Sequence, residues 1–151
     1  MRINIIGVVL GTVLGIFLLV LFPMYQIGIY EQVSAQEQSL SYTRNLIDEV
    51  IDSRQLTEST LQNFYLNIGS ASSNLSAEII RETKVVNPDP LKPGSTYVAY
   101  LANDDIYNYN QGDLITVHVY QVGSSLTERI AMSALNLKIS SIDFTLTMRV
   151  R

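Results

Sequence analysis

The sequence contains no cysteine and no tryptophan, and its only histidine is His118. Without cysteine the chain cannot form disulfide bonds, thiolate metal sites or redox motifs. A single histidine would need several carboxylates beside it to complete a metal site. We therefore predict no metal site and no cofactor.

Charged residues are absent from Ile3 to Tyr30, and Ile5–Phe22 is apolar apart from Thr12 and the glycines. Eighteen helical residues at about 1.5 Å each reach roughly 27 Å, close to the hydrocarbon thickness of a bilayer. The pattern therefore predicts that residues 1–30 form a transmembrane anchor that contacts membrane lipid.

A cleaved signal peptide is the alternative interpretation of this segment. Signal peptides have an apolar core of about 7–15 residues, with a small-x-small site close behind it. Here the apolar run is longer, and the nearest such site, Val33-Ser34-Ala35, lies about a dozen residues beyond Phe22. These features favour an anchor that is retained.

The charges that flank the apolar run predict its orientation. Arg2 precedes the run, and no Lys or Arg follows it until Arg44. Since positive residues stay on the cytoplasmic side, we expect a single-pass protein of the cell membrane, with a cytoplasmic N-terminus and an extracytoplasmic C-terminal domain. Tyr25 and Tyr30 lie where an outer aromatic belt is expected.

Basic residues are scarce in the rest of the chain. The sequence has 14 acidic residues against ten Lys and Arg, and only Arg2 lies before Glu31. Nucleic acids and anionic headgroups are bound by clustered Lys and Arg. An acidic chain of this kind predicts no nucleic-acid partner.

The remaining helices are predicted from apolar spacing and end signals. Residues 31–56 contain no proline or glycine and form the expected helical stalk, and Pro23 is expected to kink its junction with the anchor. A second helix begins at the N-cap residue Thr57 and is expected to stop at Gly69. The apolar stripe of the stalk is predicted at Val33, Leu40, Leu46, Ile47, Val50 and Ile51, and that of the second helix at Leu61, Phe64, Tyr65 and Ile68.

Alternating apolar residues predict strands in the second half of the chain. The expected strands are residues 75–86, 97–101, 114–122 and 142–150, with a proline-rich loop at 87–94. Ser125 and Glu128 have capping-box spacing, which predicts a short helix through about Ala134. The fold class is therefore α+β: a transmembrane helix, a stalk helix, then a domain at 57–151 with about four antiparallel strands and helices on one face.

No catalytic motif is present. His118 lies between two valines in a predicted strand, and no nucleophile or acid near it in the sequence suggests a triad. Six oxygen-bearing side chains could serve calcium, but the EF-hand order is not met and turn chemistry explains them equally well. These side chains are Asn103, Asp104, Asp105, Asn108, Asn110 and Asp113. We predict a protein that is not an enzyme and has no catalytic residues.

Gly7, Gly11 and Gly15 lie four residues apart inside the apolar run. Small residues at this spacing form one helix face and allow close packing of transmembrane helices. Glycine is also generally commoner in such helices, but a tandem register favours a real interface. We predict a helix–helix interface at these three glycines, with other membrane proteins or a second copy as the partner.

The order of parts resembles that of TadE-like pseudopilins and related small pilin-like proteins of bacterial secretion and conjugation systems. The likeness lies in "INIIGVVLGTVLGIFLLVLFPMYQIGIY", in the helical stalk after it, and in the ending "DLITVHVYQVG" followed by "ISSIDFTLTMRVR". The resemblance implies a non-catalytic subunit or assembly factor of a pilus, secretion or conjugation apparatus. Prepilins carry a glutamate five residues after the cut, where Thr12 and Ile16 stand here, which favours a retained anchor.

An extracytoplasmic module that binds a ligand or peptide, such as a sensor domain of a membrane complex, is the alternative function. That function predicts a concave pocket or an exposed edge strand in the α+β domain.

Overall fold

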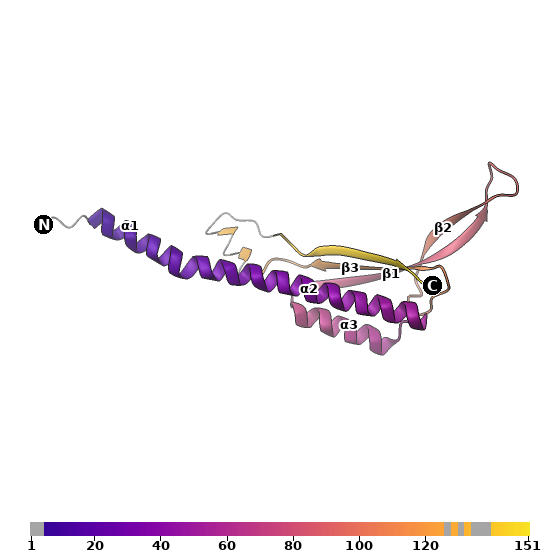
Figure 1. Cartoon of the computed structure of the whole chain (residues 1–151), viewed down its shortest axis with the longest axis horizontal. Coiled ribbons are helices and arrows are strands. Elements are labelled where there is room, and N and C mark those ends of the chain that lie inside the picture. Colours follow the sequence, from indigo (N-terminus) through magenta and orange to yellow (C-terminus); the bar gives the residue numbers. More distant parts are fainter. Residues whose placement is uncertain (1–4, 126–127, 130–131, 134–139) are drawn as a thin grey trace. The chain divides into compact units, whose positions relative to one another are not determined.

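The computed structural model describes residues 5–125, 128–129, 132–133 and 140–151. The chain divides into two compact units, of which one comprises Met1–Ser34 with Ser124–Ser140 and the other Ala35–Gly123 with Ser141–Arg151. Figure 1 labels three helices and the first three strands; the unlabelled yellow arrow at the C-terminal end of the chain is the last strand, β4 (Asp143–Arg149).

The first unit begins with a long apolar helical segment. Helix α1 spans Ile5–Ile16, a π-helical turn η1 spans Phe17–Leu21, and helix α2 spans Phe22–Ser53 and continues into the second unit. The Phe22 amide donates to the carbonyl of Phe17, and the next residue, Pro23, has no amide hydrogen to donate. The wider π turn therefore lies where the proline interrupts the α-helical hydrogen-bond pattern.

The predicted capping box is present in the first unit. The Ser125 amide donates to the Glu128 carboxylate at 2.5 Å, and the Glu128 amide donates to the Ser125 hydroxyl at 3.1 Å. Glu128, Arg129, Met132 and Ser133 are helical. The predicted end at Ala134 lies outside the described residues.

In the second unit, α2 packs through a face that is narrower than the predicted stripe. Leu46, Ile47 and Val50 are buried as expected, but Leu40 and Ile51 are only partly buried, and Val33, which belongs to the first unit, is 49% exposed. Small side chains complete the buried face instead: Ala35, Ser39 and Thr43. The Thr43 hydroxyl donates to the Ser39 carbonyl at 2.8 Å, so its burial leaves no unpaired donor.

Helix α3 spans Glu58–Ala71 and begins as the sequence predicts. The Thr57 side chain accepts a hydrogen bond from the Thr60 amide, and Phe64 and Ile68 are buried as predicted. Burial of Tyr65 was predicted wrongly, because this residue is 44% exposed. The predicted stop at Gly69 is wrong, because the helix continues to Ala71 and the Ser72 amide donates to the Ile68 carbonyl. Gly69 has a helical backbone here, and the left-handed turn that a C-terminal glycine usually supplies is not used.

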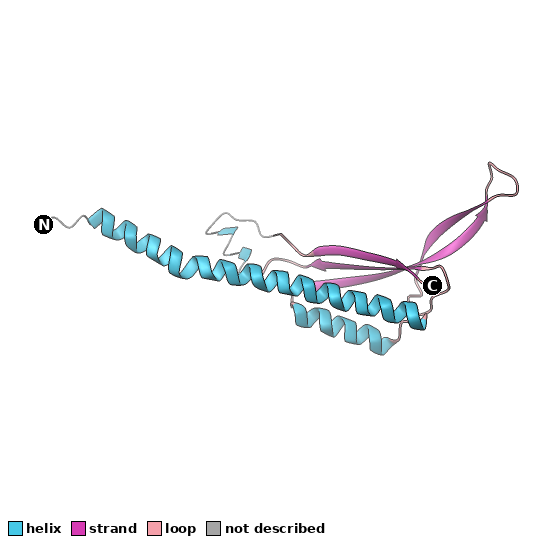
Figure 2. Ribbon diagram, in the orientation of Figure 1, coloured by secondary structure: helices cyan, strands magenta, loops and turns pink. Residues whose placement is uncertain are grey.

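Four antiparallel strands form one sheet in the order β2-β1-β3-β4. Their bounds are Leu75–Pro88 for β1, Thr96–Asn103 for β2, Leu114–Gln121 for β3 and Asp143–Arg149 for β4. Figure 2 shows α3 and the second-unit part of α2 on one side of this sheet. The α+β arrangement with an antiparallel sheet is therefore confirmed.

The long strand β1 pairs with different neighbours along its length. Residues 75–82 pair with β3, whereas residues 81–88 pair with β2. The far part of the β1–β2 hairpin therefore lacks a third strand, and it extends away from the rest of the sheet (Figure 1). Val86, Val98 and Leu101 are each at least half exposed on this hairpin.

The core lies between the helices and the inner face of the sheet. Ile115, Val117 and Val119 of β3 are fully buried against Ile47 and Val50 of α2 and their neighbours. The outer face carries polar pairs, including the hydroxyls of Thr116 and Thr147 at 2.9 Å. This division matches the alternating pattern of the strands.

Candidate functional site

One helix near the N-terminus is long and apolar enough to cross a membrane. It begins at Ile5, and none of its most apolar 18-residue window is buried in the described structure. A core helix of similar composition would be covered by protein on most sides. Leaving so much apolar surface in water is unfavourable by roughly 25 cal/mol per Å².

The only side chain in Ile5–Phe22 that carries a polar group is satisfied within the helix. The Thr12 hydroxyl donates to the Val8 carbonyl at 2.9 Å. This local bond removes the need for water or a partner residue at Thr12. The segment therefore presents no unsatisfied hydroxyl to a hydrocarbon environment.

The three predicted interface glycines, Gly7, Gly11 and Gly15, all lie in α1. A four-residue spacing advances about 40° around a helix, so they share one face. A Cβ placed on Gly11 or Gly15 would meet nothing within 4 Å. Nothing else in the described chain therefore packs closely against Gly11 or Gly15.

A buried ion pair that the sequence analysis did not predict lies in the second unit. Arg81 of β1 donates from Nη2 and Nε to Asp113 Oδ2, at 2.8 and 3.1 Å. Asp113 also accepts from the backbone amides of Asn110 and Lys84. The sequence does indicate a buried charge here, because Arg81 continues the alternation of Leu75, Ala77 and Ile79 and therefore occupies a core-facing position.

The environment of this pair shifts two pKa values. Burial of the Asp113 carboxyl raises its pKa, but the amide of Asn110 and the Arg81 guanidinium outweigh burial, so the net pKa is lowered. Tyr109 lies beneath Arg81, whose Cζ is 5.4 Å from the ring centroid. Burial raises the pKa of Tyr109 to about 12. Its hydroxyl has no hydrogen-bond partner among the described residues.

These shifts predict that the domain loses stability at both ends of the pH scale. The lowered pKa of Asp113 means that the unfolded state takes up a proton first, so stability falls as the pH drops below about 5. The raised pKa of Tyr109 means that the unfolded state loses its proton first, so stability falls between pH 10 and about 12. Urea unfolding across pH measures both effects, and Tyr109→Phe should remove the alkaline loss that Tyr109 causes. A flat pH profile would contradict this assignment.

His118 does not belong to a catalytic arrangement in the described structure. Its Nε2 lies 2.8 Å from Asp143 Oδ1 on the outer face of the sheet, and its ring contacts Tyr120. The oxygen-rich segment at 103–113 forms local turns, in which Asn103 and Asp105 accept from the amides of Asp105 and Tyr107. No group of three or more His, Asp or Glu side chains that could hold a metal ion occurs among the residues described.

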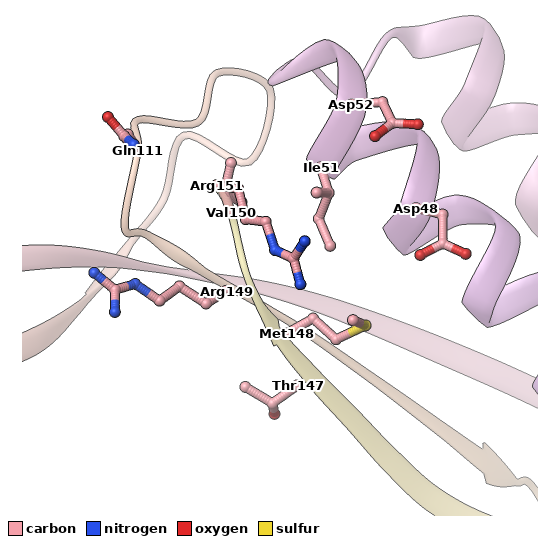
Figure 3. A pocket seen from close by; sticks show the side chains of 9 residues that line it. All are labelled: Asp48, Ile51, Asp52, Gln111, Thr147, Met148, Arg149, Val150 and Arg151. Carbon is pink, nitrogen blue, oxygen red and sulfur yellow. The ribbon is translucent and has the colours of Figure 1, made fainter.

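An open groove of about 780 Å³ lies between the end of α2 and the end of β4 (Figure 3). Asp48 and Asp52 of α2 line one side, and Arg149 and Arg151 belong to the opposite side. Met148 points toward the helix, whereas Thr147 and Arg149 lie on the other face of the strand (Figure 3). The sequence analysis did not predict this groove, because its two sides are about a hundred residues apart in the chain.

The chain was compared with protein-family models, with curated proteins and with solved structures, and nothing matches in any of the three comparisons.

Proposed function

We propose that this protein is a non-catalytic, membrane-anchored subunit or assembly factor of a larger membrane complex, of the pseudopilin-like kind found in pilus, secretion or conjugation systems. Its N-terminal helix is the anchor and the site of association, and its α+β domain is displayed outside the membrane. The observation that carries the proposal is the apolar window of this helix, of which nothing is buried in the described structure.

Two further observations support this function. The apolar helix is followed by α2 and then by a small domain, which is the order of parts on which the resemblance depends. The glycine face has no packing partner in the described chain. Small residues every four positions let two helix backbones approach closely in lipid, where exclusion of water provides no driving force.

Replacing Gly11 with leucine is expected to weaken association of the helix in membranes by about tenfold, or 1.4 kcal/mol. The leucine side chain would hold the two backbones apart at the centre of the glycine face. Energy transfer between labelled full-length chains in lipid vesicles measures the association. Val13→Leu is the matched control, because Val13 lies about 200° around the helix from Gly11. Equal association of the Gly11→Leu and wild-type proteins would exclude the glycine interface.

Capture of a ligand or peptide by the domain remains the second candidate function. The groove beside Met148 and the outer edge of β4 are the kinds of feature that this function predicts. They support a binding role that is compatible with a membrane anchor.

A further inference from the structure

The outer edge of β4 exposes a regular row of backbone groups. On the inner edge, the Val150 amide donates to the Asp113 carbonyl and the Gln121 amide donates to the Ile142 carbonyl, both at 2.9 Å. Residues two apart in an antiparallel strand direct their backbone groups to the same side, so the even-numbered residues face β3. The outward-directed amides and carbonyls therefore belong to Asp143, Thr145, Thr147 and Arg149.

Nothing in β4 itself protects this edge. β4 is the last strand of the sheet, and no other strand in the described part of the chain pairs with its outer edge. It contains no proline, and its only charged residues are Asp143 and Arg149 at its two ends. An edge of this kind is a template for pairing with another strand.

We propose that the outer edge of β4 pairs antiparallel with the same edge of a second copy, about a two-fold axis at Leu146. Asp143 and Arg149 are each three residues from Leu146, so Asp143 of each copy lies opposite Arg149 of the other. Thr145 likewise lies opposite Thr147. All four of these pairings join residues whose amides and carbonyls point outward, so each can form a hydrogen-bonded pair.

Among the residues of β4 itself, charge complementarity favours this register over its neighbours. Opposite charges directly across an antiparallel pair are favourable, and the Leu146-centred register contains two such pairs. A shift of two residues in one direction removes both pairs, because Asp143 then lies opposite Thr147 and Arg149 opposite Ser141. A shift in the other direction places Asp143 opposite Arg151, which lies beyond the end of β4 and whose carbonyl already accepts from Arg54 Nε at 3.1 Å. In the described structure Arg149 makes no ion pair, while Asp143 contacts His118 through Oδ1.

On the core-facing side of the sheet, the same pairing brings apolar side chains together. In the Leu146-centred register, Phe144 of the second copy lies opposite Met148, whose residue surface is 43% exposed. Met148 and Ile51 line the open groove (Figure 3), so the added phenylalanine ring covers apolar surface there. The edge thus offers backbone, charged and apolar contacts to one partner.

The pairing differs from association through the glycine face. Within the second unit, β4 and α2 run in the same direction (Figure 1), so antiparallel pairing of β4 reverses one copy relative to the other. The two Ala35 ends then point away from each other. Edge pairing is therefore a different association from packing of the glycine faces, and it does not depend on the proposed anchoring function.

The absence of cysteine in the natural chain allows a clean cross-linking test. Full-length Thr145→Cys and Thr147→Cys chains, carrying different tags and both also carrying Gly11→Leu, are mixed in detergent and oxidised. Opposed residues in an antiparallel pair lie within the Cα separation that a disulfide tolerates. We expect a disulfide between the two variants, and little from either variant alone. No cross-link in the mixture, or equal cross-linking of Thr145→Cys with itself, would overturn the proposal.

Charge reversal tests the ion pairs in the same assay. Asp143→Arg and Arg149→Asp should each reduce the cross-link strongly, because like charges then face each other, and the double variant should restore it. Arg44→Asp makes the same charge change as Arg149→Asp on an exposed part of α2 and should leave the cross-link unchanged. Loss in the double variant equal to that in each single variant would overturn the proposed register.

Discussion

Replacing Asp113 with alanine is expected to lower the free energy of unfolding of the second unit by about 3–5 kcal/mol, the usual cost of breaking a buried ion pair. The substitution leaves the Arg81 guanidinium buried without its carboxylate. It also removes the acceptor for the amides of Asn110 and Lys84. Urea unfolding of the detergent-solubilised full chain, followed by circular dichroism, measures the loss.

Asp105→Ala provides the matched control for this prediction. Asp105 also faces Arg81, but its side chain is half exposed and the two charged groups are 3.6 Å apart. Its backbone carbonyl, which accepts from Arg81 Nη1, is retained in the variant. We expect a much smaller loss of stability than for Asp113→Ala, because exposed ion pairs contribute little and the variant otherwise loses only exposed turn hydrogen bonds, from the Tyr107 amide and the Asn108 side chain. If Asp113→Ala were as stable as Asp105→Ala, the Arg81–Asp113 pair would not be a major stabilising contact.

The structural role of the pair is to hold the β2–β3 connection against β1. This connection is joined in turn to the end of α2, where the Tyr109 amide donates to the Arg54 carbonyl and the Leu56 amide donates to the Tyr107 carbonyl. The Gly112 amide donates to the Val150 carbonyl just beyond β4. The ion pair therefore supports the same end of the domain that carries the open groove.

Elements with strong periodicity were predictable from the sequence. The Thr57 cap and the buried Phe64 and Ile68 of α3 follow from local spacing alone, and so does the alternation of β4. The buried face of α2 was only partly predictable, because Ser39 and Thr43 are polar by type yet fully buried. Their burial depends on how closely the helix approaches its neighbours, which a pattern of apolar residues does not encode.

Contacts between residues far apart in the sequence were not predictable in the same way. Arg81 and Asp113 are 32 residues apart, and only the β1–β3 register brings them together. The position of β4 at the edge of the sheet depends on the strand order, for which the sequence has no local signal. The spacing of Gly7, Gly11 and Gly15 on one helix face, by contrast, was visible in the sequence.

Single cysteines provide the most direct test of the central claim, that the N-terminal helix lies in the membrane and the domain lies outside the cytoplasm. Val13→Cys places a thiol within α1, and Lys92→Cys places one on the exposed β1–β2 hairpin. A membrane-impermeant maleimide reacts with the thiolate, which requires water. Labelling is measured on the full chain in intact spheroplasts, after lysis, and after detergent.

We predict that Lys92→Cys is labelled in intact spheroplasts, whereas Val13→Cys stays unlabelled after lysis and reacts only once detergent is added. Labelling of Val13→Cys in water as readily as Lys92→Cys would contradict a membrane-spanning helix. Labelling of Lys92→Cys only after lysis would contradict display of the domain outside the cytoplasm.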